Sequence, residues 1–400
     1  MRSFRIGSLF GIPIKLDLTF LLVLPLFAYL IGVHIQPLVE LLNGTMNAGI
    51  DIDIVSTGYR PWLLGFVAAI GLFAGVVLHE LGHSLTAQRY GFPIDSITLW
   101  LFGGIAALSE MPEDWRQELV IAIMGPLVSV GIGIVSFGLF LLAPSAPSAL
   151  PASVATPLAV QGTLFVFAYL AVLNVVLAVF NMVPAFPMDG GRVLRALLAR
   201  DRPYARATQQ AARVGKLFAL VMGLVGLLAF NIILIGVAFF VYIAASSESQ
   251  QVMMKAAFEG VTVEDIMTPI PALHTVTPET SVAALLGRMF SERHTGYPVL
   301  ENGQLIGLVT LSDAEGIKPV ERDAFSVEEV MTTDLETIDL EADAMTAIER
   351  MQQSNIGRLL VMNGDDFVGL VSRSDVMTAL DVINKSGSID ITRRRVNRSL

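Results

Sequence analysis

The stretch from Gly71 to Tyr90 reads GLFAGVVLHELGHSLTAQRY, and it places two histidines and a glutamate inside an apolar run long enough to cross a bilayer. His79 and His83 are four residues apart, so on a helix both imidazoles lie on one face, where they can bind one tetrahedral ion. Glu80 lies beside the first histidine without being a ligand. Such a carboxylate can take a proton from a water that the metal activates and pass it to a leaving amine. The pattern therefore predicts a zinc hydrolase, for which a peptide bond is the usual target.

A polar seam satisfied by contacts between helices is the alternative interpretation of this pentapeptide. Ionisable groups inside a membrane span are costly and usually functional, so the membrane context favours the zinc site. The chain has no cysteine, which excludes thiolate ligands and disulfides, so the third ligand must be a histidine or a carboxylate. His34 lies at the end of a span, and His274 and His294 lie in the polar half of the chain. The best remaining candidate is Asp189.

Asp189 belongs to the segment NMVPAFPMDGGR, residues 181 to 192. Its prolines interrupt a helix, and Gly190 and Gly191 allow the backbone to approach its neighbours closely. Irregular backbone at membrane depth is tolerated where it lines a buried or wet cavity, so this segment can carry Asp189 to the histidines. In the other interpretation, Asp189 is a surface turn residue at a helix end.

The composition places most of the first 246 residues in lipid. The 400 residues are 54% hydrophobic and only 16% charged, whereas an average soluble domain is about 45–50% apolar and about 25% charged. A charge-free linker rich in Ala, Pro and Ser is predicted at residues 143–159. Stretches long enough to be helices in the bilayer lie near residues 18–35, 62–90, 117–142, 161–182 and 206–245.

The stretch 206–245 is either one long helix or two short ones that meet near Phe230 and Asn231. Lys and Arg in short loops favour the cytoplasmic side, and they gather in residues 192–216 and in the first 15 residues. Two helices would return the C-terminal part to the cytoplasm, whereas one would leave it outside. We therefore expect six spans in a multi-pass plasma-membrane protein, with the N-terminus and the C-terminal module in the cytoplasm.

The C-terminal part is an acidic soluble module with an internal repeat. After residue 250 the chain holds 13 basic and 23 acidic groups, which account for the net charge of −10 and argue against nucleic-acid binding. Val263–Thr268 recurs as Val327–Thr332, and Gly307–Asp313 recurs as Gly369–Asp375. Each copy places an amphipathic helix before two β-branched runs and a further helix, an α+β order. The two copies should pack together as one unit.

The repeat resembles a tandem CBS pair over residues 260–383, with copies at about 260–318 and 324–383. In that module the hydroxyl and the carboxylate of a Thr/Ser-x-x-Asp pattern contact the phosphate and the ribose of a nucleotide. The resemblance implies AMP, ADP or ATP as a regulatory ligand, although many such pairs are inert scaffolds. It also implies a homodimer through the CBS domains, since such pairs commonly associate face to face. The residues that match the pattern are Thr310, Asp313, Ser372 and Asp375.

Residues 1–250 resemble the site-2 protease family, in which HExxH on one transmembrane helix precedes N-x-x-P-x-x-P-x-D-G-G on a later one. The resemblance implies an intramembrane zinc metalloprotease in which His79, His83 and Asp189 bind one Zn²⁺ and Glu80 is the base. It implies regulated intramembrane proteolysis of transmembrane substrates, such as anti-sigma factors or membrane-tethered regulators. One branch of the family carries a C-terminal CBS pair, which this chain matches. Other members carry a PDZ domain between spans, and no insertion of that size is present.

Three weaker features each allow two interpretations. Asn174 and Asn181 are two helical turns apart and either bind a substrate carbonyl or oxyanion or join helices by hydrogen bonds. Residues 97–107 form either a hairpin that offers an edge strand to an unwound substrate or a plain re-entrant turn. The basic tail, residues 384–400, either touches anionic lipid or is a solvated end.

The predicted fold is thus a polytopic α-helical membrane protein with about six transmembrane helices and a C-terminal α+β tandem CBS pair. A CBS-gated membrane transporter or channel is the alternative function, but it has no use for a glutamate between two metal ligands. An inactive homologue that serves as a binding platform is a third, and the complete ligand set counts against it. The expected partners are the lipid bilayer, a transmembrane protein substrate and an adenine nucleotide.

Overall fold

The computed structural model of the chain describes residues 3–100, 103–108, 112, 114–143 and 156–386. These residues form two compact units, Met1–Val252 and Met253–Leu400. Most of the predicted linker at 143–159 and of the basic tail at 384–400 lies outside the described residues.

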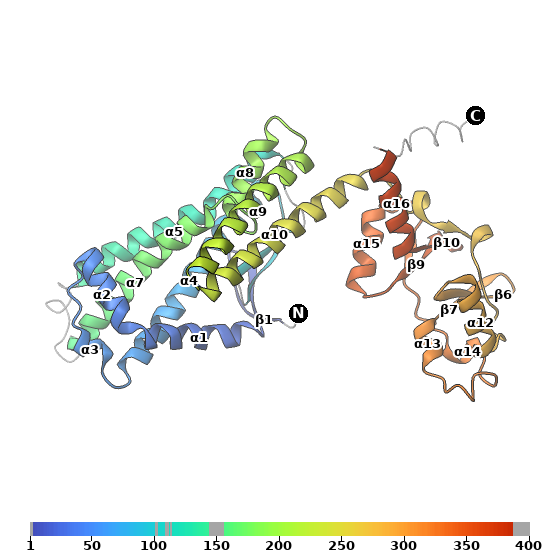
Figure 1. The fold of residues 1–400 in the computed structure, drawn as a ribbon, viewed down its shortest axis with the longest axis horizontal. Coiled ribbons are helices and arrows are strands. Elements are labelled where there is room, and N and C mark those ends of the chain that lie inside the picture. Colours follow the sequence, from blue (N-terminus) through green and yellow to red (C-terminus); the bar gives the residue numbers. More distant parts are fainter. Residues whose placement is uncertain (1–2, 101–102, 109–111, 113, 144–155, 387–400) are drawn as a thin grey trace. The chain divides into compact units, whose positions relative to one another are not determined.

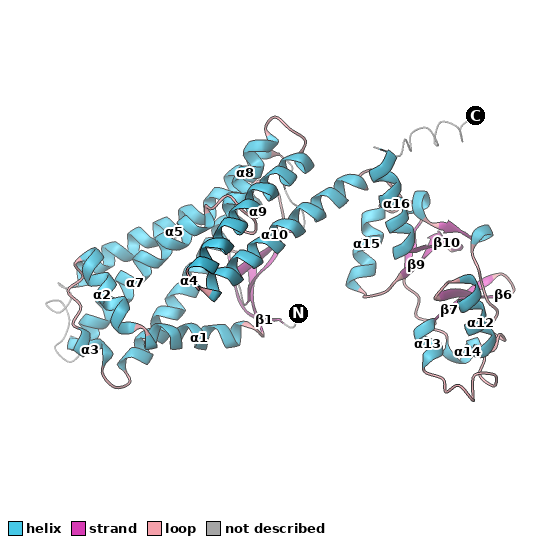
Figure 2. Cartoon of the chain, viewed as in Figure 1, coloured by secondary structure: helices cyan, strands magenta, loops and turns pink. Residues whose placement is uncertain are grey.

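The first unit consists mainly of long helices, with one small sheet (Figures 1 and 2). The pair α1 (Phe20–Val33) and α2 (Ile35–Met46) is apolar enough to cross a membrane as one broken span, with a bend of 68°. Counting that pair, up to six spans occur among the described residues, as the sequence predicted. The helices long enough to cross alone are α4 (Arg60–Arg89), α5 (Trp115–Leu142), α7 (Pro157–Asn181), α9 (Tyr204–Leu228) and α10 (Ile232–Ala257).

The helix predicted near residues 18–35 is α1, the first part of a broken span. It ends at Val33, and His34 has a non-helical backbone at the start of α2. Pro37 lies in the first turn of α2, where its ring would clash with the carbonyl group of Val33 in a continuous helix. The helix therefore bends instead of continuing, and α1 alone is only 14 residues long.

The stretch 206–245 forms two helices, which confirms the preferred prediction. Phe230 lies between them with a left-handed backbone, φ 51°, and its side chain is 94% exposed. The side chain of Asn231 then accepts a hydrogen bond from the backbone nitrogen of Leu234 at 3.0 Å, which satisfies a donor in the first turn of α10.

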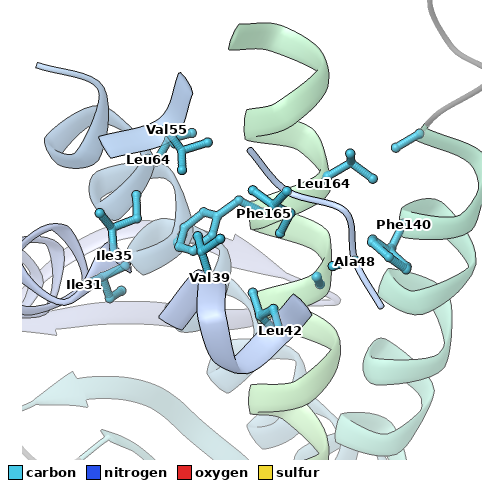
Figure 3. Close-up of a cluster of buried hydrophobic side chains, with 14 of the residues drawn as sticks. Ile31, Ile35, Val39, Leu42, Ala48, Val55, Leu64, Phe140, Leu164 and Phe165 are labelled. Carbon is cyan, nitrogen blue, oxygen red and sulfur yellow. The ribbon is translucent and has the colours of Figure 1, made fainter. Parts of the chain in front are cut away.

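Large apolar side chains cover the outside of the long helices. Leu22, Ile134, Val179 and Leu228 are each at least 66% exposed. Exposed apolar surface on so many helices is expected where the solvent is lipid. Inside the bundle, Phe165 of α7 is fully buried among side chains of α1, α2 and α4 (Figure 3). A short helix, α3 (Ile52–Ser56), contributes Val55 to the same cluster.

The sheet has the strand order β1-β2-β3-β4. Its strands are β1 (Ser3–Leu9), β2 (Ile12–Asp17), β3 (Ile94–Trp100) and β4 (Gly103–Leu108). The antiparallel β3–β4 pair is the hairpin predicted at residues 97–107, whereas β1 and β2 were not predicted. Ile12 of β2 and Ile97 of β3 are fully buried and pack against Leu81 of α4. The sheet therefore lies against the helix that carries HExxH.

The second unit repeats one arrangement twice, as predicted. In the first copy, α12 (Val282–Glu292) precedes β6 (Gly296–Glu301), β7 (Gln304–Thr310) and α13 (Leu311–Glu315). The second copy has α15 (Ala344–Gln353), β9 (Arg358–Asn363), β10 (Asp366–Ser372) and α16 (Arg373–Ser386). The strands form two sheets, β6-β7 and β5-β10-β9-β8, the latter with β5 (Thr268–Pro269) and β8 (Thr337–Asp339). Short helices α11 (Val263–Ile266) and α14 (Val327–Val330) open the two copies, each with a capping box.

Candidate active site

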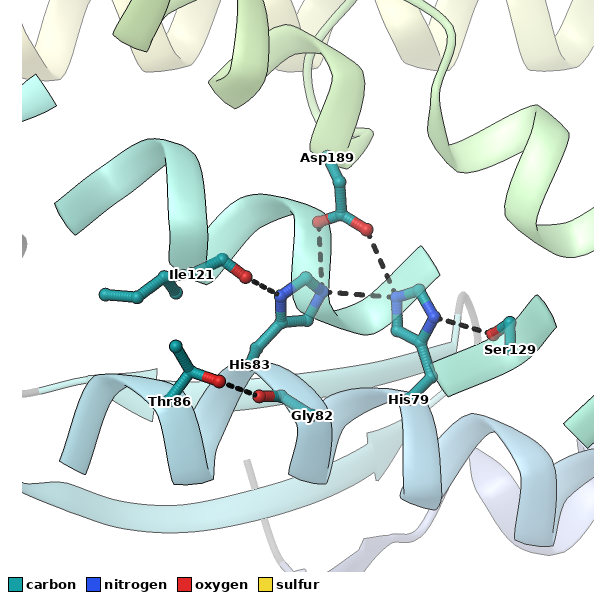
Figure 4. Close-up of polar contacts among 7 residues, drawn as sticks. All are labelled: His79, Gly82, His83, Thr86, Ile121, Ser129 and Asp189. Carbon is teal, nitrogen blue, oxygen red and sulfur yellow. Dashed lines mark hydrogen bonds and ion pairs between the residues drawn. The ribbon is translucent and has the colours of Figure 1, made fainter. Parts of the chain in front are cut away.

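Three buried side chains from two helices converge in the first unit (Figure 4). His79 and His83 are on α4, and Asp189 is the first residue of α8 (Asp189–Ala199). The two histidine Nε2 atoms lie 3.2 Å apart. Oδ2 of Asp189 lies 3.1 Å from Nε2 of His79, and its Oδ1 lies 3.2 Å from Nε2 of His83. The structure therefore brings together the two histidines of HExxH and the aspartate that is 106 residues further along the chain.

The spacing of these atoms fits a zinc ion. Zinc in proteins is tetrahedral, with bonds of about 2.0–2.1 Å to histidine nitrogen and carboxylate oxygen, so its ligand atoms lie about 3.3 Å from one another. The two histidine nitrogens are 3.2 Å apart, and each lies 3.1–3.2 Å from one carboxylate oxygen of Asp189, close to that spacing. Three protein ligands leave the fourth position open, which is typical of catalytic rather than structural zinc sites.

Both imidazoles are oriented by α5. Nδ1 of His83 donates to the carbonyl oxygen of Ile121 at 2.7 Å, and Nδ1 of His79 lies 2.9 Å from Oγ of Ser129. Because a carbonyl oxygen only accepts, the proton of a neutral His83 is on Nδ1, and its Nε2 keeps a free lone pair for a metal. Hydrogen bonds of this kind fix ring orientation in metal sites.

Gly125 of α5 faces the two imidazoles. A β-carbon at this position would lie 2.7 Å from Nε2 of His79 and closer still to Nε2 of His83. No other residue type leaves that space open, so the absence of a side chain at Gly125 is part of the ligand geometry.

The loop before α8 explains how Asp189 reaches the site. A β-carbon on Gly190 would clash with the backbone of Met182, and one on Gly191 would lie 2.7 Å from the backbone of Ala185. The two glycines therefore let the chain fold back tightly on itself, as the sequence predicted. This turn places the aspartate at the start of α8, buried and directed at the histidines.

Glu80 projects from α4 towards β4. A β-carbon on Gly104 would lie 3.2 Å from the carboxyl carbon of Glu80, so the backbone of β4 passes directly beside this carboxylate. The buried cluster of possible ligands in the described part of the chain consists of His79, His83 and Asp189, and Glu80 is not part of it. This position agrees with a proton carrier rather than a metal ligand.

The two asparagines differ in their surroundings. Asn174 is fully buried, and its amide nitrogen donates to the carbonyl oxygen of Leu170 at 2.8 Å. Its Oδ1 faces Gly75 of α4 and has no hydrogen-bond partner among the described residues. The amide nitrogen carries a second N–H beside the one that bonds Leu170, so both interpretations of Asn174 stay open. Asn181, the last residue of α7, is half-buried, and its substrate role stays a prediction.

In the second unit, a cleft of about 460 Å³ contains the first Thr-x-x-Asp motif. Burial lowers the pKa of Arg358, which also lines the cleft, and the charge of Asp313 opposes that shift. Thr310 and Asp313 form a capping box at the start of α13, and the hydroxyl and backbone nitrogen of Ser372 bond Asp375 in the same way. Helix capping is thus a second physical reason for the repeated motif.

Comparisons with known proteins then decide the family. The model for Peptidase family M50 matches residues 67–224, and the model for the CBS domain matches residues 263–314 and 327–382. The zinc metalloprotease MJ0392 of Methanocaldococcus jannaschii is 36% identical over 381 residues, which cover 95% of this chain and 97% of that protein. The chain belongs to peptidase family M50, the site-2 proteases.

Further relatives of this M50 protease agree. The putative zinc metalloprotease Rip3 of Mycobacterium tuberculosis is 32% identical over 88% of this chain and 91% of its own length. A solved structure, the site-2 protease from Methanocaldococcus jannaschii, is 37% identical and covers 62% of this chain and 95% of that one, with a TM-score of 0.38. The predicted family and the metalloprotease activity are confirmed, and the transporter or channel alternative is set aside.

Proposed function

We propose that His79, His83 and Asp189 hold one zinc ion and that Glu80 carries the proton in the hydrolysis of peptide bonds within the membrane. The convergence of three buried side chains supports this most strongly: the two histidine Nε2 atoms are 3.2 Å apart, and each lies 3.1–3.2 Å from one of the two carboxylate oxygens of Asp189. When bound, zinc supplies a Lewis acid that polarises a carbonyl group and makes water nucleophilic near neutral pH.

Glu80 supplies the acid–base chemistry. Its carboxylate takes a proton from the attacking water and passes it to the nitrogen of the departing amine, as its position beside the ligands allows. Asp189 and the two histidines stay unprotonated as ligands, so no other carboxylate of the site is needed for this proton transfer.

β4 offers the substrate a backbone to bind. A peptide bond in an intact helix is shielded by its own hydrogen bonds, so the substrate must unwind before cleavage. β4 is the last strand of its sheet and passes beside Glu80. An extended substrate segment that adds to this edge would lie against the catalytic carboxylate.

The cleft of the second unit supports binding of an adenine nucleotide. A ribose hydroxyl donates to a carboxylate such as Asp313, and the guanidinium of Arg358, which lines the same cleft, binds phosphate. Occupancy of this cleft modulates proteolysis in this proposal. The CBS domains are cytoplasmic, form the contact in a homodimer, and serve a protease that cleaves transmembrane regulators such as anti-sigma factors.

Reconstitution tests the proposed chemistry directly. The full chain is placed in liposomes with a set of tagged single-span proteins, and cleavage products are identified by mass spectrometry. The proposal predicts cuts inside the spans, loss of cleavage after treatment with a zinc chelator, and recovery when zinc is returned. Cleavage that survives complete zinc removal would contradict it. AMP, ADP and ATP are then added in turn to measure the change in rate.

A further inference from the structure

A second buried cluster ties together the helices that hold the metal ligands. Arg195 of α8 is only 1% exposed. Its Nε donates to Oε1 of Glu118 on α5 at 2.7 Å, its Nη2 lies 2.5 Å from the same oxygen, and its Nη1 pairs with Glu248 of α10. The rings of Phe186 and Tyr204 lie 5.0 and 4.9 Å from the guanidinium carbon. The side chain of Arg195 therefore joins α8 to α5 and α10 through ion pairs. It also lies over the ring of Phe186, which precedes α8, and over the ring of Tyr204 on α9.

Glu118 shares a face of α5 with three residues of that helix that contact or face the two histidines. Ile121, Gly125 and Ser129 follow it at intervals of three, four and four residues, the spacing of one helical stripe. Within this stripe, the carbonyl group of Ile121 bonds His83, Gly125 leaves room for both rings, and the hydroxyl group of Ser129 bonds His79. Any movement of α8 along this stripe would change the position of Asp189 relative to the histidines.

Stability alone does not explain the buried ion pairs of Arg195 with Glu118 and Glu248. Burying charges costs several kcal/mol per ion before pairing, and apolar replacements of buried ion pairs are often neutral or stabilising. Oε2 of Glu118 is buried without a hydrogen-bond partner among the described residues, so the desolvation cost is not fully offset. The planar guanidinium holds several N–H donors in a rigid geometry, so it fixes the position of each carboxylate that it pairs with.

We propose that Arg195 is a positioning residue: through Glu118 and Glu248 it fixes α8 against α5 and so holds Asp189 at the distance from His79 and His83 that zinc requires. This inference rests on the zinc site proposed above. It assigns Arg195 no contact with substrate or metal. Its effect passes through Asp189, which is six residues earlier on the same helix.

Arg195→Lys and Glu118→Gln test the proposal in the full-length protein in detergent. Lysine keeps the charge but loses the fork, and glutamine keeps the shape of Glu118 but loses its charge. Each should raise the dissociation constant for zinc about 10- to 100-fold, the effect of removing groups that orient metal ligands. The visible absorption of the cobalt(II)-substituted protein should change in both variants, because it reports the geometry of the ligands.

Phe165→Leu is the matched control. Phe165 is fully buried in a different cluster, so this substitution should lower stability without changing a contact of the site. It should lower the melting temperature and leave both zinc affinity and the cobalt spectrum unchanged. Unchanged zinc affinity and spectrum in Arg195→Lys and Glu118→Gln, with a lowered melting temperature, would overturn the proposal. If Arg195→Lys does not fold, the isosteric Glu118→Gln decides alone. A wild-type protein that binds no zinc would instead refute the zinc site itself.

Discussion

Gly125 lies opposite the imidazole of His79 so closely that a β-carbon would come within 2.7 Å of its Nε2. Gly125→Ala should therefore abolish zinc binding, because the methyl group occupies space next to both ligand nitrogens. Zinc content per chain, measured by elemental analysis, checks this. The melting temperature of the metal-free protein should change little, since the clash is with two side chains rather than with backbone.

Gly131→Ala is the control for that substitution on the same helix. A β-carbon there meets nothing within 4 Å. Replacing glycine by alanine in a helix interior stabilises by about 0.5–1 kcal/mol, so this variant should keep its zinc and show a slightly raised melting temperature. Equal zinc content in the two alanine variants would contradict the role given to Gly125.

Glu80→Gln should separate catalysis from metal binding. Glutamine keeps the size of the side chain but cannot carry the proton, so the rate of cleavage should fall at least about 100-fold, the lower end of the range for general acid–base catalysis. Zinc content should stay the same as in the wild type, because Glu80 is not part of the cluster of His79, His83 and Asp189. If the variant loses its zinc as well, Glu80 contributes to metal binding, and the separate role given to it is wrong.

Ser129→Ala should weaken zinc binding by about 10- to 100-fold, because His79 loses the hydroxyl group that orients its ring. Competition with a coloured chelator measures the dissociation constant. Ser136→Ala serves as the control, since Ser136 is buried on the same helix but, within the described part of the chain, bonds neither histidine. Similar affinities in both variants would show that the Ser129 contact has no effect on the metal.

Asp313→Asn and Asp375→Asn should affect nucleotide binding unequally. Both aspartates cap a helix, so each substitution has a similar local cost. Only Asp313 is among the residues that line the described cleft together with Arg358, so its substitution should weaken AMP binding more strongly in calorimetry. Equal loss in the two variants would place nucleotides at both copies, and no loss in either would favour helix capping as the sole role of the motif.

Much of this architecture follows from local patterns. The length of the apolar runs predicted the spans, and the four-residue spacing of His79 and His83 predicted their shared face. The bend after Val33 was not predicted, although Pro37 lies just beyond the predicted helix at 18–35. β2 was missed too, although Ile12 and Ile14 begin an alternating pattern that is typical of strands.

The contacts that tune the site depend on distant partners. In the sequence, Arg195 is one of the basic residues at 192–216 that indicate topology, yet it is buried against Glu118 and Glu248, which are 77 and 53 residues away. Nothing near Arg195 in the sequence marks those partners. Gly125 and Ser129 likewise lie in an apolar span without a local signal, and only the packing of α5 on α4 reveals what they do.

The central claim is that three side chains hold one zinc ion, and elemental analysis of the purified full-length protein tests it most directly. Wild type, His79→Ala and Asp189→Ala are compared under the same conditions. The account predicts about one zinc per chain in the wild type and loss of the metal in both variants, because each removes one of only three protein ligands. A wild-type protein without zinc, or an Asp189→Ala variant that binds zinc as tightly as the wild type, would contradict it.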